Sequence, residues 1–291
     1  MGESLVLGSA FLWAFATVLA KPMIGRIRPG SIVAMHAWVA VLVGLILLVA
    51  LGRLDELAAI NPGTILLLGV SGSFVIIGDV FLVRSFSHLD PGKAFTVASG
   101  LFVLFTLLAG WIIIGDPVTR VTLIGALAII IGVYMTRGGA HNVQTRAVKF
   151  AGSARAATPT VLLAGLMWAL GLIGFDLAIE NVDPIAGSTV GYLFPALAYL
   201  VWATHQRRFD VISLAASDRR LMIASAVFGG LALVGYTLGI KYAHASIVAM
   251  LESTAPIFAI LLAVAFFKER LTARTGAGVG FCAVGIAVLV I

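Results

Sequence analysis

Three ionisable side chains lie inside long apolar stretches of the sequence: His36, Asp79 and Glu252. A charge at the centre of a membrane helix costs about 2.5–3.5 kcal/mol on insertion scales, so each of these groups needs a reason to be there. A carboxylate in such a place can bind the amino group of a substrate or carry a coupling proton. Structural alternatives stay open at this point. Asp79 can pair with Arg84 near a helix end, and Glu252 can sit in a solvated vestibule. His36 can simply hydrogen-bond to a neighbour.

Two tryptophans, Trp13 and Trp168, accompany these groups and occupy equivalent places in the two halves of the chain. They can flank a cavity and offer flat apolar walls to a ring-bearing substrate. Packing or anchoring at the interface is the alternative, although Trp13 lies some nine residues into its run, which is deep for an interfacial belt. The remaining predicted substrate-binding residues are Phe95, Ser99, Tyr192 and Tyr236.

The composition shows which elements must position these side chains. Of 291 residues, 61% are hydrophobic and 11% are charged, against roughly 25% charged in a soluble domain. This excludes a soluble globular enzyme, a disordered chain and a disulfide scaffold. A spanning helix needs about 20 apolar residues, and the continuous runs are too long for barrel strands. We therefore predict an all-α membrane protein with ten transmembrane helices, over residues 4–20, 31–52, 63–83, 92–114, 119–136, 158–179, 185–204, 219–240, 245–267 and 272–291.

The chain also contains an internal duplication. An offset of 155 residues aligns Trp13 with Trp168, and an offset of 153 residues aligns Gly132 with Gly285. Each half then holds five spans, and because five is odd the second half enters the membrane from the opposite side. Such inverted repeats are typical of alternating-access transporters. We predict a first five-helix repeat over 1–137, a linker over 138–157 and a second repeat over 158–291.

The distribution of basic residues predicts how the chain is oriented. Of the 19 Lys and Arg residues, only Arg53, Arg120 and Lys241 fall in loops on one side of the membrane. The positive-inside rule then places both termini on the non-cytoplasmic side of the cell inner membrane. The net charge of +6 is explained by this orientation, so nucleic acid is not an expected partner.

Several motifs resemble one transporter family in their order along the chain. Residues 253–258 read STAPIF, residues 268–272 read KERLT, and a glycine-spaced helix follows. Trp13-Ala14 and Lys21 occupy the first span and its end. This arrangement resembles the drug/metabolite transporter superfamily, in particular its ten-helix EamA-type permeases. The resemblance implies a secondary carrier with a cavity between the halves, usually an exporter of amino acids or other metabolites. The bacterial aromatic amino acid exporters look like the nearest type.

These observations together favour a secondary active transporter that exports small metabolites by alternating access. Amino acids are the expected substrates, with aromatic ones favoured. A channel and an intramembrane enzyme are the alternatives, but the sequence has no His-Glu-x-x-His site, no Gly-x-Ser-x-Gly elbow and no Walker loop. No metal or cofactor is predicted. The expected partners are the substrate and the lipid bilayer, and we expect a monomer or weak dimer. The small-residue pairs Gly276/Gly280 and Ala128/Gly132 predict that the last spans of the two halves form a scaffold, in which they pack against each other or against a partner subunit.

Overall fold

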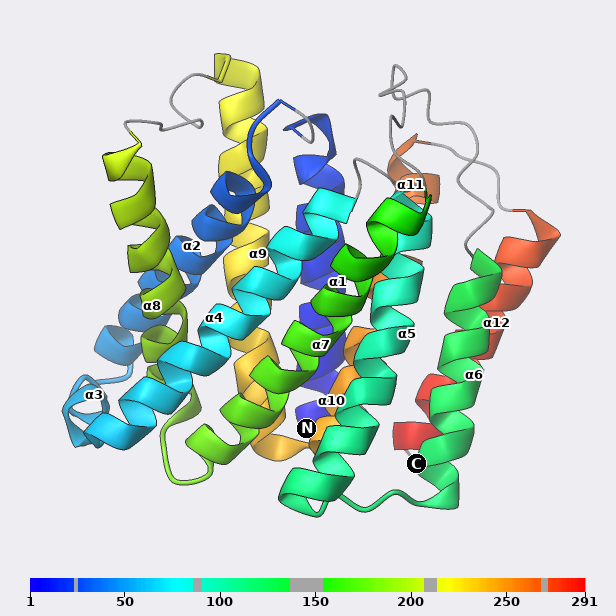
Figure 1. Cartoon of the computed structure of the whole chain (residues 1–291), viewed down its shortest axis with the longest axis horizontal. Helices are drawn as coiled ribbons and strands as arrows, with labels where there is room; N and C mark the ends of the chain where they lie inside the picture. Colours follow the sequence, from blue (N-terminus) through cyan, green and yellow to red (C-terminus); the bar gives the residue numbers. More distant parts are fainter. Residues whose placement is uncertain (24–25, 86–90, 137–153, 207–213, 268–271, 291) are drawn as a thin grey trace.

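The computed structural model describes residues 1–23, 26–85, 91–136, 154–206, 214–267 and 272–290, and its elements are all helices (Figure 1). In chain order they are α1 (Gly2–Ala20), the 3₁₀ turn η1 (Lys21–Met23), α2 (Pro29–Ala50), α3 (Asp55–Ala59), α4 (Pro62–Ser85), α5 (Pro91–Ala109), the π-helix η2 (Gly110–Ile114), α6 (Arg120–Thr136), α7 (Ala154–Ile179), α8 (Pro184–His205), α9 (Ala216–Tyr242), α10 (Ala245–Glu252), α11 (Ala255–Phe267) and α12 (Ala273–Val290). The predicted linker, 138–157, lies outside the described residues as far as residue 153.

Each of the ten predicted spans is helical. Within the described residues, eight helical stretches are long and apolar enough to cross a membrane. Two shorter apolar helices, Arg120–Met135 and Ala273–Leu289, occupy the remaining predicted spans. The predicted all-α membrane fold is confirmed.

Two spans are interrupted, whereas the apolar pattern alone suggested continuous helices. The span over 92–114 ends in the π-helix η2, and the span over 245–267 divides into α10 and α11 after Glu252. Pro256 has no N–H to donate to the carbonyl of Glu252, but it fits the first turn of a new helix. The interruption therefore leaves Glu252 at a helix end in the interior of a span.

The two halves of the chain run through the molecule in opposite directions. In Figure 1, α1 rises from the end of the molecule that carries both termini, and α7 descends toward that same end. We call this the termini end, and we call the opposite end, where α6 ends and α7 begins, the linker end. Equivalent helices of the two halves are thus antiparallel, as the odd number of spans in each half predicts.

The halves exchange their first helices. The most extensive contacts of α1 are with α9 of the second half, and α7 packs most extensively on α4 of the first half. Because α10 and α11 also contact α1, and α5 contacts α7, two mixed units result. We call them the α1 unit (α1, α9, α10 and α11) and the α7 unit (α7, α4 and α5). The halves are repeats in sequence but not separate bodies in space.

Small residues allow the close approach within each unit. A Cβ on Gly239 of α9 would meet the side chain of Val6 in α1, and a Cβ on Gly174 of α7 would meet Ser71 in α4. Such contacts bring helix backbones together where lipid provides no hydrophobic driving force between helices.

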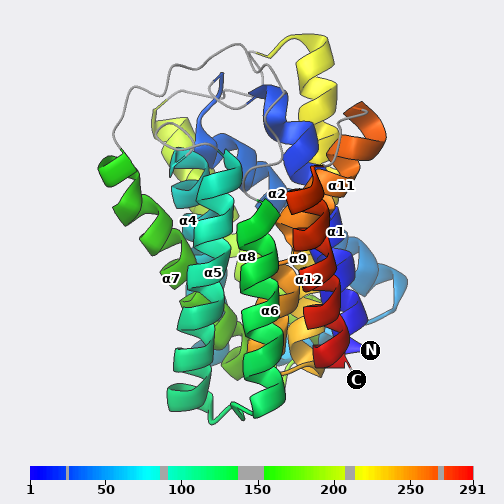
Figure 2. The same ribbon diagram turned by 90° about the vertical axis from the view of Figure 1, so that its right-hand side faces the viewer.

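The last helices of the two halves, α6 and α12, pack side by side, as predicted (Figure 2). The glycines at their contact differ from the predicted pair on α12. A Cβ on Gly132 would meet Cys282 and the carbonyl of Gly278, whereas no described atom lies within 4 Å of a Cβ on Gly276 or Gly280. Gly276 and Gly280 therefore do not mediate the contact with α6, because their face of α12 points away from it. The alternative that they pack against a partner subunit stays a prediction.

Candidate functional site

A cavity lies between the α1 unit and the α7 unit. The space between its walls that is not filled by atoms, including space open to solvent, is about 520 Å³. Six of the thirteen lining residues come from the α7 unit and seven from the α1 unit: Val75, Asp79, Phe95, Ser99, Phe102 and Trp168; Ser9, Trp13, Ala232, Leu233, Tyr236, Glu252 and Ser253.

Glu252 is the acidic group on the wall that the α1 unit provides. As the last residue of α10, it reaches the cavity from the helix interruption. The hydroxyl of Ser9 lies 3.5 Å from Glu252 Oε1 and donates a shorter bond, 2.9 Å, to the carbonyl of Ala232. Glu252 Oε2 is buried and has no hydrogen-bond partner among the described residues. One carboxylate oxygen is therefore left for a ligand or a proton.

Asp79 provides the equivalent group on the α7 unit. It is 3% exposed, and its Oδ1 accepts a hydrogen bond of 2.8 Å from Nε1 of Trp168. Its Oδ2 is buried and has no hydrogen-bond partner among the described residues. The alternative in which Asp79 serves mainly to pair with Arg84 is not supported, because its described partner is the indole across the α4–α7 contact.

Aromatic rings cover much of the remaining wall. Phe95 and Phe102 both meet Trp168 edge to face, with ring centroids 6.3 and 5.8 Å from the indole. Trp13 and Tyr236 line the opposite side. The cavity thus combines two carboxyl groups with flat apolar surfaces, and no Lys, Arg or His is among its described lining residues.

The structure brings seven of the nine predicted substrate-binding residues to this one cavity: Trp13, Asp79, Phe95, Ser99, Trp168, Tyr236 and Glu252. The other two, His36 and Tyr192, lie outside its lining. His36 packs edge to face on Trp13 at 5.3 Å and shares a hydrogen bond of 3.1 Å with the hydroxyl of Ser225. Tyr192 is fully buried against Phe175. Neither residue therefore lines this cavity, and a role of either in binding stays a prediction.

Sequence reasoning missed Phe102, Ser9 and Ser253, which also line the cavity. Phe102 lies three residues after Ser99 and seven after Phe95, a spacing that places all three on one helix face. That periodicity was the available signal. Small hydroxyl residues such as Ser9 give no such signal, because they occur throughout membrane helices.

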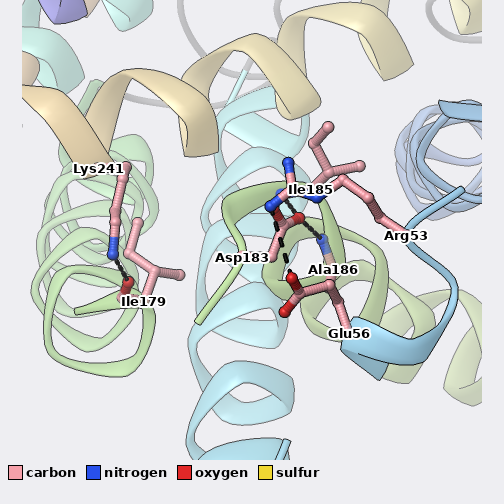
Figure 3. A network of polar contacts seen from close by, with 7 residues as sticks. All are labelled: Arg53, Glu56, Ile179, Asp183, Ile185, Ala186 and Lys241. Atoms are coloured by element: carbon pink, nitrogen blue, oxygen red, sulfur yellow. Dashed lines mark hydrogen bonds and ion pairs between the residues drawn. The ribbon is translucent and has the colours of Figure 1, made fainter. Parts of the chain in front are cut away.

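Among the described residues, several polar contacts that cross the molecule lie at the termini end. Figure 3 shows Arg53, in the connection after α2, forming an ion pair with Asp183 at the start of α8, with Glu56 of α3 beside it. Asp183 also caps α8, because its Oδ1 accepts the N–H groups of Ile185 and Ala186 at 2.9 Å each. A single side chain thus holds the start of α8 and links the two halves of the chain.

Two further sets of contacts join the α1 unit to the α7 unit at this end. Lys241 of α9 donates hydrogen bonds to the carbonyl oxygens of Ile179 and Glu180, at 2.7 and 2.5 Å, where α7 ends (Figure 3 shows the first). Asp116, which follows η2, accepts the N–H of Ser246 at 2.9 Å and pairs with His244 at 2.9 Å. By contrast, the ion pair of Arg26 with Asp218 near the linker end lies within the α1 unit and its adjoining turn.

Comparisons with known proteins agree with this architecture. The EamA-like transporter family matches residues 1–138 and 156–291. An uncharacterized transporter of Archaeoglobus fulgidus is 25% identical over 222 residues, which cover 76% of this chain and 73% of that protein. A crystal structure aligns with a TM-score of 0.78 and 18% identity over 99% of this chain and 95% of its own, which shows a shared fold. Because the family match extends over nearly the whole sequence, this chain belongs to the EamA-like transporter family of the drug/metabolite transporter superfamily and is a multi-pass membrane transporter.

Proposed function

We propose that the chain is a secondary active carrier that exports small metabolites bearing an amino group, with aromatic amino acids as the first candidates. One observation carries this proposal: a carboxyl group from each mixed unit faces a single aromatic cavity between the units. The carboxyl groups can bind an amino group, and the rings can contact an apolar side chain.

Transport would proceed by movement of the α1 unit against the α7 unit. The contacts of Lys241 and Asp116 join the units at the termini end, so we propose that this end is closed in the present conformation. The distribution of loop charges supports a termini end outside the cytoplasm, and the cavity would then load from the cytoplasmic side. Loss of the termini-end contacts, with closure at the linker end, would release the substrate outside.

A proton can supply the coupling. A carboxyl group that holds a substrate amino group cannot hold a proton at the same oxygen, so the two ligands compete for Asp79 and Glu252. Competition at one alternating-access site produces exchange, in which proton entry drives substrate exit. The inner membrane maintains the proton gradient that such an exporter requires.

Counterflow in proteoliposomes tests this function. Vesicles loaded with an unlabelled aromatic amino acid should transiently accumulate the labelled compound, and the initial rate should saturate with concentration. A linear, non-saturating flux without counterflow would identify a channel and refute the carrier.

The role of Trp168 can be tested in the same assay. Trp168→Ala should weaken transport of ring-bearing substrates because it removes the ring that Phe95 and Phe102 contact and leaves Asp79 without its donor. The matched control is Trp111→Ala, because Trp111 is 63% exposed on η2 and outside the cavity. Equal apparent affinity and rate in Trp168→Ala and the control, with both proteins folded, would remove Trp168 from the binding site.

A further inference from the structure

We infer that the cavity selects ring-bearing organic cations, specifically aromatic amines without a carboxylate, over the corresponding amino acids. This inference rests on the proposed carrier function and narrows its substrate class. Three features of the cavity wall support it: its acidic groups, the small number of hydrogen-bond donors that remain available to a substrate, and its aromatic rings.

The two acidic groups of the described wall have no basic counterpart there. Asp79 Oδ2 and Glu252 Oε2 are both buried and lack hydrogen-bond partners among the described residues. They come from opposite walls of the same cavity, so a cationic group between them gains from both. The structure describes no Lys, Arg or His in the cavity lining that could pair with a substrate carboxylate. An anionic group would enter next to two acidic groups, and like charges placed together in an interface are strongly disfavoured.

Three of the six donor side chains of the described wall are occupied by the protein itself. Trp168 Nε1 donates to Asp79, and the hydroxyl of Ser9 donates to the carbonyl of Ala232. The hydroxyl of Ser253 donates to the carbonyl of Ala249 at 2.6 Å. The donors left to a substrate carboxylate are the neutral side chains of Trp13, Ser99 and Tyr236. They carry no positive charge with which to offset the full charge of a desolvated carboxylate.

The aromatic rings favour a cation in a second way. An ammonium group is attracted to the face of a Trp, Tyr or Phe ring, and this attraction increases when water is excluded. Trp13, Tyr236 and Trp168 line the cavity beside the two carboxyl groups. The substrate's own ring can pack on the same surfaces. A flat ring joined by a short chain to a positive amine therefore matches the wall, and a carboxylate on that chain does not.

Four compounds with the same indole ring differ in the charged groups on their side chains, so they test the contribution of each charge to binding. Tryptamine has only the ammonium group, tryptophan amide keeps the ammonium and replaces the carboxylate by a neutral amide, tryptophan is the zwitterion, and indole-3-propionate has only the carboxylate. The purified chain is reconstituted in proteoliposomes, and counterflow of labelled tryptamine is measured with each compound as an unlabelled competitor. The same competition is then measured against labelled tryptophan. We expect tryptamine and tryptophan amide to compete at concentrations about tenfold or more below tryptophan, and indole-3-propionate to be the weakest.

Variants identify the groups responsible for this preference. Asp79→Asn and Glu252→Gln should each reduce the ratio of tryptamine to tryptophan affinity, and the double variant should bring that ratio close to one. Binding to the purified variants is measured as ligand-induced change in melting temperature, so that the ratio can be read even where transport is lost. Asp55→Asn is the control, because Asp55 is an exposed acidic residue of α3 outside the cavity.

The outcomes distinguish this inference from the proposed function. If tryptophan exchanges and competes as well as tryptamine or better, the carrier stands and the inference is overturned. An amine preference that survives in the double variant also overturns it, because the two carboxyl groups would then not be its cause. If none of these compounds nor any other amino acid or amine shows counterflow, the proposed function itself fails. A preference of tenfold or more that disappears in the double variant and persists in Asp55→Asn supports the inference.

Discussion

The substitution Lys241→Met should open the termini end of the cavity. Lys241 closes α9 of the α1 unit onto the end of α7 in the α7 unit, through two hydrogen bonds to backbone carbonyl oxygens. Methionine has a similar length and apolar stem but no donor, so the substitution removes these bonds with little change in packing. The charge is also lost from the C-terminal end of α7, where a cation is favoured by the helix dipole.

The magnitude follows from the nature and exposure of the two bonds. A hydrogen bond from a charged group contributes about 1.5–3 kcal/mol when it is buried. Lys241 is partly exposed, and its bond to the carbonyl of Glu180 is a surface bond, so solvent screening lowers the value for the pair to about 1–2 kcal/mol. If this free energy favours the conformation closed at the termini end, its loss raises the open population about 5–30-fold.

Accessibility of a single cysteine measures that population. Replacing Cys282 by Ala removes the sole native cysteine, and Ser99→Cys then introduces a nearly isosteric thiol into the cavity wall. A membrane-impermeant maleimide is added to one face of sealed vesicles at a time. We expect Lys241→Met to increase the labelling rate about 5–30-fold from the face at the termini end and to decrease it from the opposite face.

The matched control is Arg120→Met, which removes one exposed positive charge at the same end of the molecule, at the start of α6. Equal labelling rates in Lys241→Met and this control would contradict the assignment of Lys241 as a contact that closes the cavity. A parallel increase from both faces would contradict it too, because it would indicate general loosening rather than a shift between two conformations.

Three further predictions concern the carboxyl groups, the Trp168–Asp79 bond and the α6–α12 contact. Glu252→Gln should change the pH dependence of transport, because glutamine cannot take up a proton, and an identical pH profile would exclude Glu252 from coupling. Trp168→Phe should lower the free energy of unfolding by about 1–3 kcal/mol, because it keeps a ring but leaves buried Asp79 Oδ1 without its donor; an unchanged denaturation midpoint relative to Trp111→Phe would show that this bond contributes nothing. Gly132→Ala should destabilise the protein by about 1–3 kcal/mol, because its Cβ would press on Gly278 and Cys282, whereas Gly276→Ala, in open space, should not; equal melting temperatures would refute the packing argument.

Much of the fold and of the cavity could be predicted from the sequence because burial in lipid leaves a strong signal. Apolar length alone located the ten spans, and the repeat alone showed that the halves are inverted. The rule that an ionisable group inside a membrane needs a reason singled out Asp79 and Glu252, and both line the cavity. The sequence repeat pairs Trp13 with Trp168, and both tryptophans line the cavity.

The remainder depends on contacts that a single sequence does not encode in a readable form. The exchange of α1 and α7 between the halves arises from helix packing, and the glycines that permit it look like any other small residues in an apolar run. His36 shows a similar limit. Its type and place resemble those of a site residue, but in the structure it packs on Trp13 and bonds to Ser225 outside the cavity lining. The rotation of a helix about its axis decides whether a polar group faces a cavity or a neighbouring helix. The sequence of a helix that is apolar on all sides does not specify that rotation.

The exchange of first helices explains how the cavity can change shape without losing its chemistry. Asp79 is held by Trp168 within the α7 unit, and Glu252 lies beside Ser9 within the α1 unit, so neither carboxyl group depends on the opposite unit for its described hydrogen bond. The contact of the Ser253 hydroxyl with the Ser99 carbonyl does cross between the units, but at 3.4 Å it is long. Relative movement of the units therefore changes the separation of the two carboxyl groups while each keeps its own surroundings. A substrate amine between them would join the units, and its replacement by protons would release that link. In the proposed mechanism, the same two side chains would thus couple binding to movement.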